Sequence, residues 1–134
     1  MDEESKIIVG IRIEKSKDDI RRAHSLLTDD AYRQAISRAS YAVFAIASAV
    51  LLTQGLTRKK HSGIESAFHQ FLVKPGLIEP EYSTIYIKAS RARQEADYAD
   101  TTEFTEVKTR QVLADSERFV QRIEKYLRDV GAIS

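Results

Sequence analysis

A short basic segment in the middle of the chain carries side chains that could bind or cleave a phosphate ester. Residues 58–63 read Arg-Lys-Lys-His-Ser-Gly, and a helix is expected to begin within this segment. The unpaired backbone N–H groups of that helix and the three cations attract anions and oppose protonation of His61. A neutral imidazole near pH 7 can act as a general base. His61 is therefore a candidate base, and Arg58 a candidate partner that stabilises negative charge on a phosphate.

The distribution of charge favours this segment as a binding site, although the net formal charge of the chain is only +1. Residues 1–30 and 65–134 each hold more acidic than basic side chains. Residues 31–64 hold no acidic side chain, and their basic ones are Arg33, Arg38, Arg58, Lys59 and Lys60. A local basic field can attract phosphates even on a nearly neutral protein. The alternative interpretation is a solvated basic turn that follows a buried, uncharged helix.

A second pattern has the spacing of a metal site. His61, Glu65 and His69 are four residues apart and would share one helical face. No second carboxylate on that helix completes a ligand shell, so an exposed polar face with a Glu–His pair explains the pattern as well. We expect neither a metal nor a cofactor.

A third pattern lies at residues 91–98, Arg-Ala-Arg-Gln-Glu-Ala-Asp-Tyr. Arg93 and Asp97 are spaced to pair on a helix surface, which would orient the guanidinium toward a phosphate. Tyr98 could then stack on a base. The alternative is a structural ion pair beside an amphipathic tyrosine.

Helices must position these side chains, because apolar residues recur at helical spacing along almost the whole chain. No run of four or more residues alternates as a strand would. Five helices joined by short turns predict an all-α, antiparallel up-and-down bundle. The first helix should bury Val9, Ile13, Ile20, Ala23 and Leu27. The second should span 31–54, begin at the Thr28-Asp29-Asp30 cap and present a stripe of Ala35, Ala39, Ala42 and Ala49.

The later helices are delimited by capping and turn residues. The expected limits are a Ser62–Glu65 capping box, a stop at Pro75-Gly76, a loop containing Pro80, a break at Thr101-Thr102 and an end at Gly131. The expected core residues are Phe68, Phe71 and Leu72 in the third helix, Tyr82, Ile85, Tyr86, Ala89 and Ala96 in the fourth, and Leu113, Ser116, Val120, Ile123, Leu127 and Val130 in the last.

Composition limits the classes of protein to which the chain can belong. With 134 residues it has the size of one domain, which we assign to residues 1–134. It has no cysteine, which excludes disulfides and thiol catalysis. Residues 39–57 carry no charge and approach the length of a membrane span, but their Ala and Ser content favours a core helix. We expect a cytoplasmic protein without a membrane role or a secretory signal.

Several segments together resemble the HEPN domain, a small helical domain of prokaryotes and higher eukaryotes. The resemblance extends over roughly residues 5–130. It rests on Tyr-Arg-Gln-Ala-Ile-Ser-Arg-Ala-Ser-Tyr-Ala-Val-Phe at 32–44, Lys-Lys-His-Ser-Gly at 59–63 with Phe68 and Phe71, and Arg-Gln-Glu-Ala-Asp-Tyr at 93–98 with Phe119-Val120.

The resemblance implies a helical bundle, usually a homodimer, that acts beside a small nucleotidyltransferase in a toxin–antitoxin-like pair. Many HEPN proteins are metal-independent ribonucleases, which carry an Arg and a His several residues apart. Here Arg58 and His61 are separated by only two residues, and no His follows Arg93. We therefore expect ribonuclease activity to be absent or very slow, unless Arg93 of one chain meets His61 of another in a dimer.

We therefore expect a HEPN protein that binds a nucleotide or RNA. In this hypothesis Lys59, Lys60 and Arg93 bind phosphate, Asp97 holds Arg93, and Tyr98 offers a ring. One alternative is a non-catalytic helical adaptor whose ligand is a partner protein, and a second is a metal-independent ribonuclease. The small-residue stripe on the second helix also predicts a homodimer.

Overall fold

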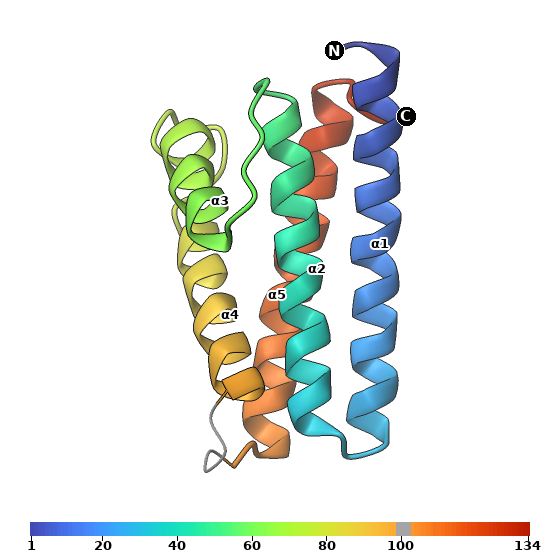
Figure 1. Ribbon diagram of the computed structural model, residues 1–134, viewed down its shortest axis with the longest axis vertical. Helices are drawn as coiled ribbons and strands as arrows, with labels where there is room; N and C mark the ends of the chain where they lie inside the picture. Colours follow the sequence, from blue (N-terminus) through green and yellow to red (C-terminus); the bar gives the residue numbers. More distant parts are fainter. Residues whose placement is uncertain (99–102) are drawn as a thin grey trace.

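The computed structural model describes residues 1–98 and 103–134, and these form an antiparallel bundle of helices (Figure 1). In chain order the elements are α1 (Glu3–Thr28), α2 (Tyr32–Leu52), α3 (His61–Phe68) with the π-helical turn η1 (His69–Val73), α4 (Glu81–Tyr98) and α5 (Glu106–Asp129). No strand occurs among the described residues. The predicted all-α up-and-down bundle is confirmed.

Helix α2 is the central element of the bundle and packs against α1, α3, α4 and α5. Its stripe of alanines is fully buried, so neighbouring backbones approach closely. Two buried hydroxyls join these backbones: Ser16 Oγ donates to the Ala42 carbonyl at 2.8 Å, and Ser40 Oγ donates to the Ala89 carbonyl at 2.9 Å. The alanine stripe is thus buried within one chain and offers no surface to a second chain. It therefore no longer supports the predicted homodimer.

Length and apolar character alone would allow α2 to cross a membrane, and it is the one such helix among the described residues. Two-thirds of its most apolar window is nevertheless buried inside the bundle. A helix that is apolar on several faces is expected at the centre of a bundle, because it is surrounded by other helices. The predicted core role of this segment is confirmed.

The helix ends agree with most of the predicted boundaries. Gly55, Gly76 and Gly131 have positive φ angles, the conformation in which glycine commonly follows a helix. The acidic cluster before α2 does not cap it as predicted: Ala31 is the N-cap residue, and no side chain accepts a hydrogen bond there. The predicted break at Thr101-Thr102 lies outside the described residues, and Thr105 caps α5 by accepting from the Lys108 N–H.

The predicted capping box at the start of α3 is wrong. Lys60 is the N-cap residue and Ser62 already lies in the first turn, without a capping hydrogen bond. Tertiary contacts fix this start, because the His61 ring stacks on Phe44 and the Tyr86 hydroxyl donates to the His61 carbonyl at 3.0 Å. The helix therefore begins one residue before the serine that local sequence favours.

The predicted core is confirmed almost throughout. Every residue expected to be buried in α1 and α4 is buried. In α5 the exception is Val130, which is half-exposed because it follows the last helical turn. In the third helical segment Phe68 and Leu72 are buried, whereas Phe71 is partly buried against the core.

Candidate functional site

The ring of Phe44 lies at the centre of the candidate site. Phe44 is almost fully buried on α2. The imidazole of His61 stacks on it with ring centroids 3.9 Å apart and an interplanar angle of 28°. The guanidinium carbon of Arg93 lies over the same ring, 5.5 Å from its centroid. Three helices, α2, α3 and α4, thus bring a histidine and an arginine together on one aromatic ring.

Burial and charge both act on His61. Partial burial lowers its pKa from the ordinary value of 6.5, and the positive charge of Arg93 lowers it further. The sequence predicted this direction, but it assigned the effect to the helix N-terminus and the cations next to His61. The imidazole is neutral near pH 7 and can accept a proton.

Arg93 is held in place by a short chain of polar contacts. Its Nη1 donates to Asp97 Oδ2 at 3.1 Å, and Ser37 Oγ donates to Asp97 Oδ1 at 2.5 Å. Burial disfavours the charged guanidinium, yet Tyr98 and Asp97 outweigh this effect and raise the pKa of Arg93. Arg93 Nε is buried and, among the described residues, has no hydrogen-bond partner. The predicted Arg93–Asp97 pair is present, and it orients a cation that retains unused donors.

We call Phe44, His61, Arg93 and Asp97 the Phe44 cluster. It joins a neutral imidazole to a fixed guanidinium, a combination that can bind a phosphate and accept a proton from a hydroxyl. Tyr98 is 75% exposed beside the cluster, so its ring is open to a ligand.

The cations before α3 are arranged differently. Arg58 Nη1 donates to the Thr57 carbonyl at 2.8 Å. The aliphatic part of the Arg58 side chain lies against Gly63, where an added Cβ would be 3.5 Å from Arg58 Cδ. Lys59 and Lys60 are exposed and form no ion pair within the described part of the chain. These side chains supply positive charge around His61, whereas the guanidinium that contacts its stacking partner is that of Arg93.

The His61–Glu65–His69 pattern does not form a metal cluster. His61 stacks on Phe44, and His69 Nδ1 lies 3.3 Å from the Ser83 hydroxyl. Over residues 1–98 and 103–134, no group of three or more His, Cys, Asp or Glu side chains could hold a metal ion.

Sequence reasoning did not find Phe44, Tyr41 or Ser37 as parts of the site. Tyr41 packs edge-on against Phe44, with ring centroids 6.3 Å apart. A signal for them was present, because Ser37, Tyr41 and Phe44 are spaced four and three apart and share one face of α2. A face that carries a hydroxyl and two aromatic rings differs from an ordinary core stripe, which is made of aliphatic side chains.

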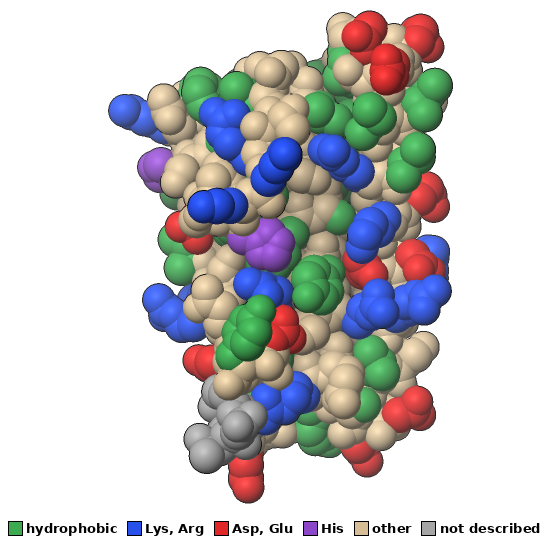
Figure 2. Space-filling view, viewed as in Figure 1, with side chains coloured by type: hydrophobic (Ala, Val, Ile, Leu, Met, Phe, Trp, Pro, Cys, Tyr) green, Lys and Arg blue, Asp and Glu red, His purple; other side chains and the backbone are tan. Residues whose placement is uncertain are grey.

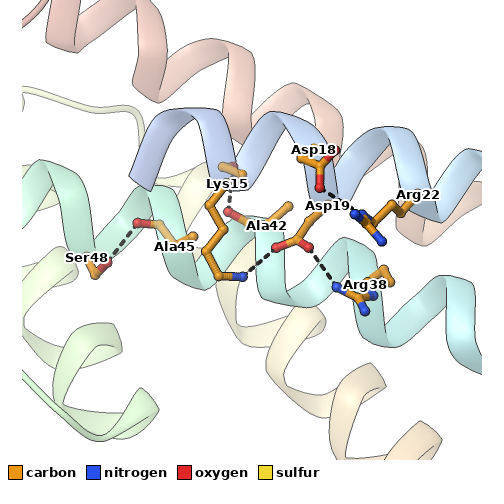
Figure 3. Close-up of polar contacts among 9 residues, drawn as sticks. Lys15, Asp18, Asp19, Arg22, Arg38, Ala42, Ala45 and Ser48 are labelled. Atoms are coloured by element: carbon orange, nitrogen blue, oxygen red, sulfur yellow. Dashed lines mark hydrogen bonds and ion pairs between the residues drawn. The ribbon is translucent and has the colours of Figure 1, made fainter. Parts of the chain in front are cut away.

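A second polar arrangement lies on α1 and α2 (Figure 3). Asp19 is 2% exposed, and its two oxygens accept from Lys15 at 3.0 Å and from Arg38 at 3.1 Å. Unlike Asp19, the two cations extend to the surface and remain about half-exposed. A buried carboxylate therefore holds one lysine and one arginine at fixed positions.

These cations share a face with the Phe44 cluster. Figure 2 shows Lys and Arg side chains gathered over α1, α2 and the segment before α3, around a histidine near the middle of that face. Two carboxylates of the neighbouring contacts, Asp19 and Asp97, form ion pairs with Arg38 and Arg93. The face is accordingly suited to an anionic ligand.

Comparison with known proteins places this chain in a family. The sequence matches the HEPN domain over residues 9–126. A Methanocaldococcus jannaschii protein named "Putative toxin MJ0605" is 37% identical over 118 residues, which cover 88% of this chain and 87% of that protein. A "UPF0332 protein" of Thermotoga maritima is 33% identical over 130 residues, which cover 97% of this chain and 98% of that protein.

A further M. jannaschii protein, named "Putative toxin MJ0142", is 30% identical over 115 residues, which cover 86% of this chain and 78% of that protein. The match to the domain spans most of the bundle, including α2, α3 and α4 with the Phe44 cluster. The chain belongs to the HEPN domain family.

Proposed function

We propose that this HEPN protein binds the phosphate of a nucleotide or of RNA at the Phe44 cluster. The observation that carries the proposal is the meeting of His61 and Arg93 on the Phe44 ring. The guanidinium of Arg93 lies over the ring, and Lys59 and Lys60 add positive charge that forms no ion pair within the described part of the chain. A phosphate would supply acceptors for these donors, and Tyr98 would offer a ring to a base.

A binding titration tests this proposal. Labelled single-stranded RNA is titrated at two salt concentrations with the wild type, Arg93→Gln and Lys59→Ala/Lys60→Ala. We expect Arg93→Gln to weaken binding about tenfold or more, as for a lost hydrogen bond between charged groups. The double variant should reduce the salt slope by about two phosphate contacts. Arg118→Gln is the matched control, because Arg118 forms an ion pair with Glu81 on another part of the bundle. Equal affinity and slope in all variants would contradict the proposal.

We further propose a toxin-like role beside a small nucleotidyltransferase in the cytoplasm. Support comes from membership in the HEPN family and from relatives that are named as toxins. The neighbouring reading frame is the direct test, and a nucleotidyltransferase there should co-purify with this chain. We also propose a homodimer, for which the support is the resemblance to HEPN proteins and no longer the alanine stripe, and which light scattering at micromolar concentration would reveal. A mass of 15.2 kDa at all concentrations would contradict it.

The adaptor alternative has one structural observation in its favour. Ile7 and Ile11 are 62% and 63% exposed and lie four residues apart on α1, so they form a small apolar patch on solvent-facing helix. The adaptor function is favoured if the wild type binds a partner protein but no RNA, and if Ile7→Asp/Ile11→Asp abolishes binding of that partner.

A metal-independent ribonuclease is the second candidate function, and the favouring observation is again the Phe44 cluster. A neutral His61 could deprotonate a ribose 2′-OH, while Arg93 stabilises the charge that develops on the phosphate. From the sequence we expected Arg93 of one chain to meet His61 of another in a dimer, but in the structure both side chains contact Phe44 within one chain. We still expect cleavage to be very slow, because the separation of Arg58 and His61 departs from that in the ribonucleases that the chain resembles.

A further inference from the structure

We propose that Arg38 forms a second phosphate-binding subsite, so that the ligand is a single strand of linked nucleotides that follows α2, and not a free mononucleotide. This inference rests on the proposed function, because it assumes a first phosphate at the Phe44 cluster. It assigns a role to Arg38, Tyr41 and Asp19, none of which belongs to that cluster.

The first argument is that Arg38 is positioned in advance. Asp19 is buried, and its carboxylate must be paired to offset the loss of hydration. It engages the Nη1 of Arg38 and the ammonium of Lys15 (Figure 3). Two cations on one carboxylate leave one net positive charge at the surface. The side chain of Arg38 is 45% exposed, and its Nε and Nη2 make no hydrogen bond within the described part of the chain, so these donors remain for a ligand.

The second argument is a depression that extends from Arg38 to Asp97 of the Phe44 cluster. It has a volume of about 590 Å³, and its lining includes Gln34, Ser37, Arg38, Tyr41 and Asp97. Asp97 belongs to the cluster and pairs with Arg93, so the depression reaches the edge of the cluster at this carboxylate. Tyr41 is 38% exposed and offers a ring on which a base can stack, and the Gln34 amide can bond to a base edge.

The third argument is the spacing along α2. Arg38 and Phe44 are six positions apart, which corresponds to about 9 Å along the helix axis. A phosphate that lies beside His61 on the Phe44 ring would therefore be more than one helical turn away from Arg38 along α2. A strand with one phosphate at the cluster, a base on Tyr41 and a later phosphate at Arg38 would occupy the whole depression.

The experiment compares two probes, adenosine 5′-monophosphate and an oligoadenylate of about eight nucleotides. The wild type should bind the oligonucleotide more tightly than the mononucleotide. Arg38→Gln should weaken oligonucleotide binding about tenfold, the effect of a lost charged hydrogen bond, and leave mononucleotide binding unchanged. Arg22→Gln is the matched control, since Arg22 is an exposed arginine paired with Asp18 on the adjoining part of α1.

Asp19→Asn separates the subsite from general charge attraction. This variant makes the protein more positive, so charge attraction alone would tighten oligonucleotide binding. If Asp19 positions Arg38, binding should instead weaken, while the circular dichroism spectrum and mononucleotide binding stay as in the wild type.

Three outcomes would overturn the inference: equal loss in Arg38→Gln and Arg22→Gln, parallel loss of mononucleotide binding, or tighter oligonucleotide binding in Asp19→Asn. An oligonucleotide that binds no better than the mononucleotide would also overturn it and leave the proposed function intact. Failure of the wild type to bind either probe would overturn the proposed function itself.

Discussion

His61 and Arg93 lie on different helices, yet both contact the ring of Phe44. The centroid of the imidazole is 3.9 Å from the centroid of this ring, and the guanidinium carbon of Arg93 is 5.5 Å from it. Phe44 therefore sets the distance between a candidate base and a candidate anion-binding group. Local sequence suggests Arg58 as the neighbour of His61, but Arg58 bonds to the Thr57 carbonyl. The pairing with Arg93 arises from the packing of α2, α3 and α4.

The titration of His61 should follow this relationship. Burial and Arg93 lower the pKa of His61 below 6.5, so proton NMR should show a titration midpoint below that value. Arg93→Gln should move the midpoint upward only in part, because burial is the larger cause. Assignment uses His61→Gln, which removes the resonance. A midpoint at or above 6.5 in the wild type would show that the imidazole is not sequestered on Phe44.

The lowered pKa of His61 also links stability to pH. The unfolded chain binds a proton on His61 at a higher pH than the folded chain does, so folding is favoured when this side chain is neutral. Its contribution should be complete above pH 6.5 and should decline as the pH falls toward the lower, folded-state pKa. Urea unfolding between pH 7.5 and 5 should show a smaller decline in His61→Gln than in the wild type. An identical decline in both proteins would refute this linkage.

Removal of the Phe44 ring should destabilise the bundle as well as the site. Phe44 is 4% exposed, and truncation of such a side chain to alanine costs about 3–5 kcal/mol in free energy of unfolding. Tyr98→Ala is the control on the same surface, where the expected change is within about 0.5 kcal/mol because the ring is 75% exposed. Urea unfolding measures both, and a small effect of Phe44→Ala would mean that the ring is not part of the core.

Two buried serines should respond oppositely to alanine. Ser16 donates to the Ala42 carbonyl, so Ser16→Ala should cost about 1 kcal/mol. Ser116 is 1% exposed, and its hydroxyl has no partner among the described residues, so Ser116→Ala should be neutral or stabilising. Thermal unfolding of both variants tests this contrast, which would fail if Ser116→Ala were the more damaging change.

Cleavage of RNA should be absent or very slow. Structured and unstructured RNA would be incubated with purified protein and a chelator, which excludes metal-dependent nucleases. Fragments that end in a 2′,3′-cyclic phosphate and disappear in both His61→Ala and Arg93→Gln would establish the ribonuclease and correct our expectation. Fragments that persist in both variants would indicate a contaminant or another site.

The fold was largely predictable because helical periodicity is a local property of the sequence. Five buried positions in α1 and the alanine stripe of α2 follow from spacings of three, four and seven. The Arg93–Asp97 pair was predictable for the same reason. Contacts between helices were not: the stacking of His61 on Phe44 and the bond from Ser37 to Asp97 depend on how α2, α3 and α4 pack. The contact of His61 with Phe44, together with the Tyr86 hydrogen bond to the His61 carbonyl, also moved the start of α3 away from its expected cap.

The position of α2 at the centre of the bundle has a consequence for synthesis. Proteins emerge from the ribosome in order, and α5, which covers part of α2, is made after α2. A nascent chain halted before α5 would expose a helix that is long and apolar enough to be taken for a membrane span. Premature termination between α2 and α5 should therefore yield fragments that depend on chaperones or associate with membranes, and cellular quality control would remove them.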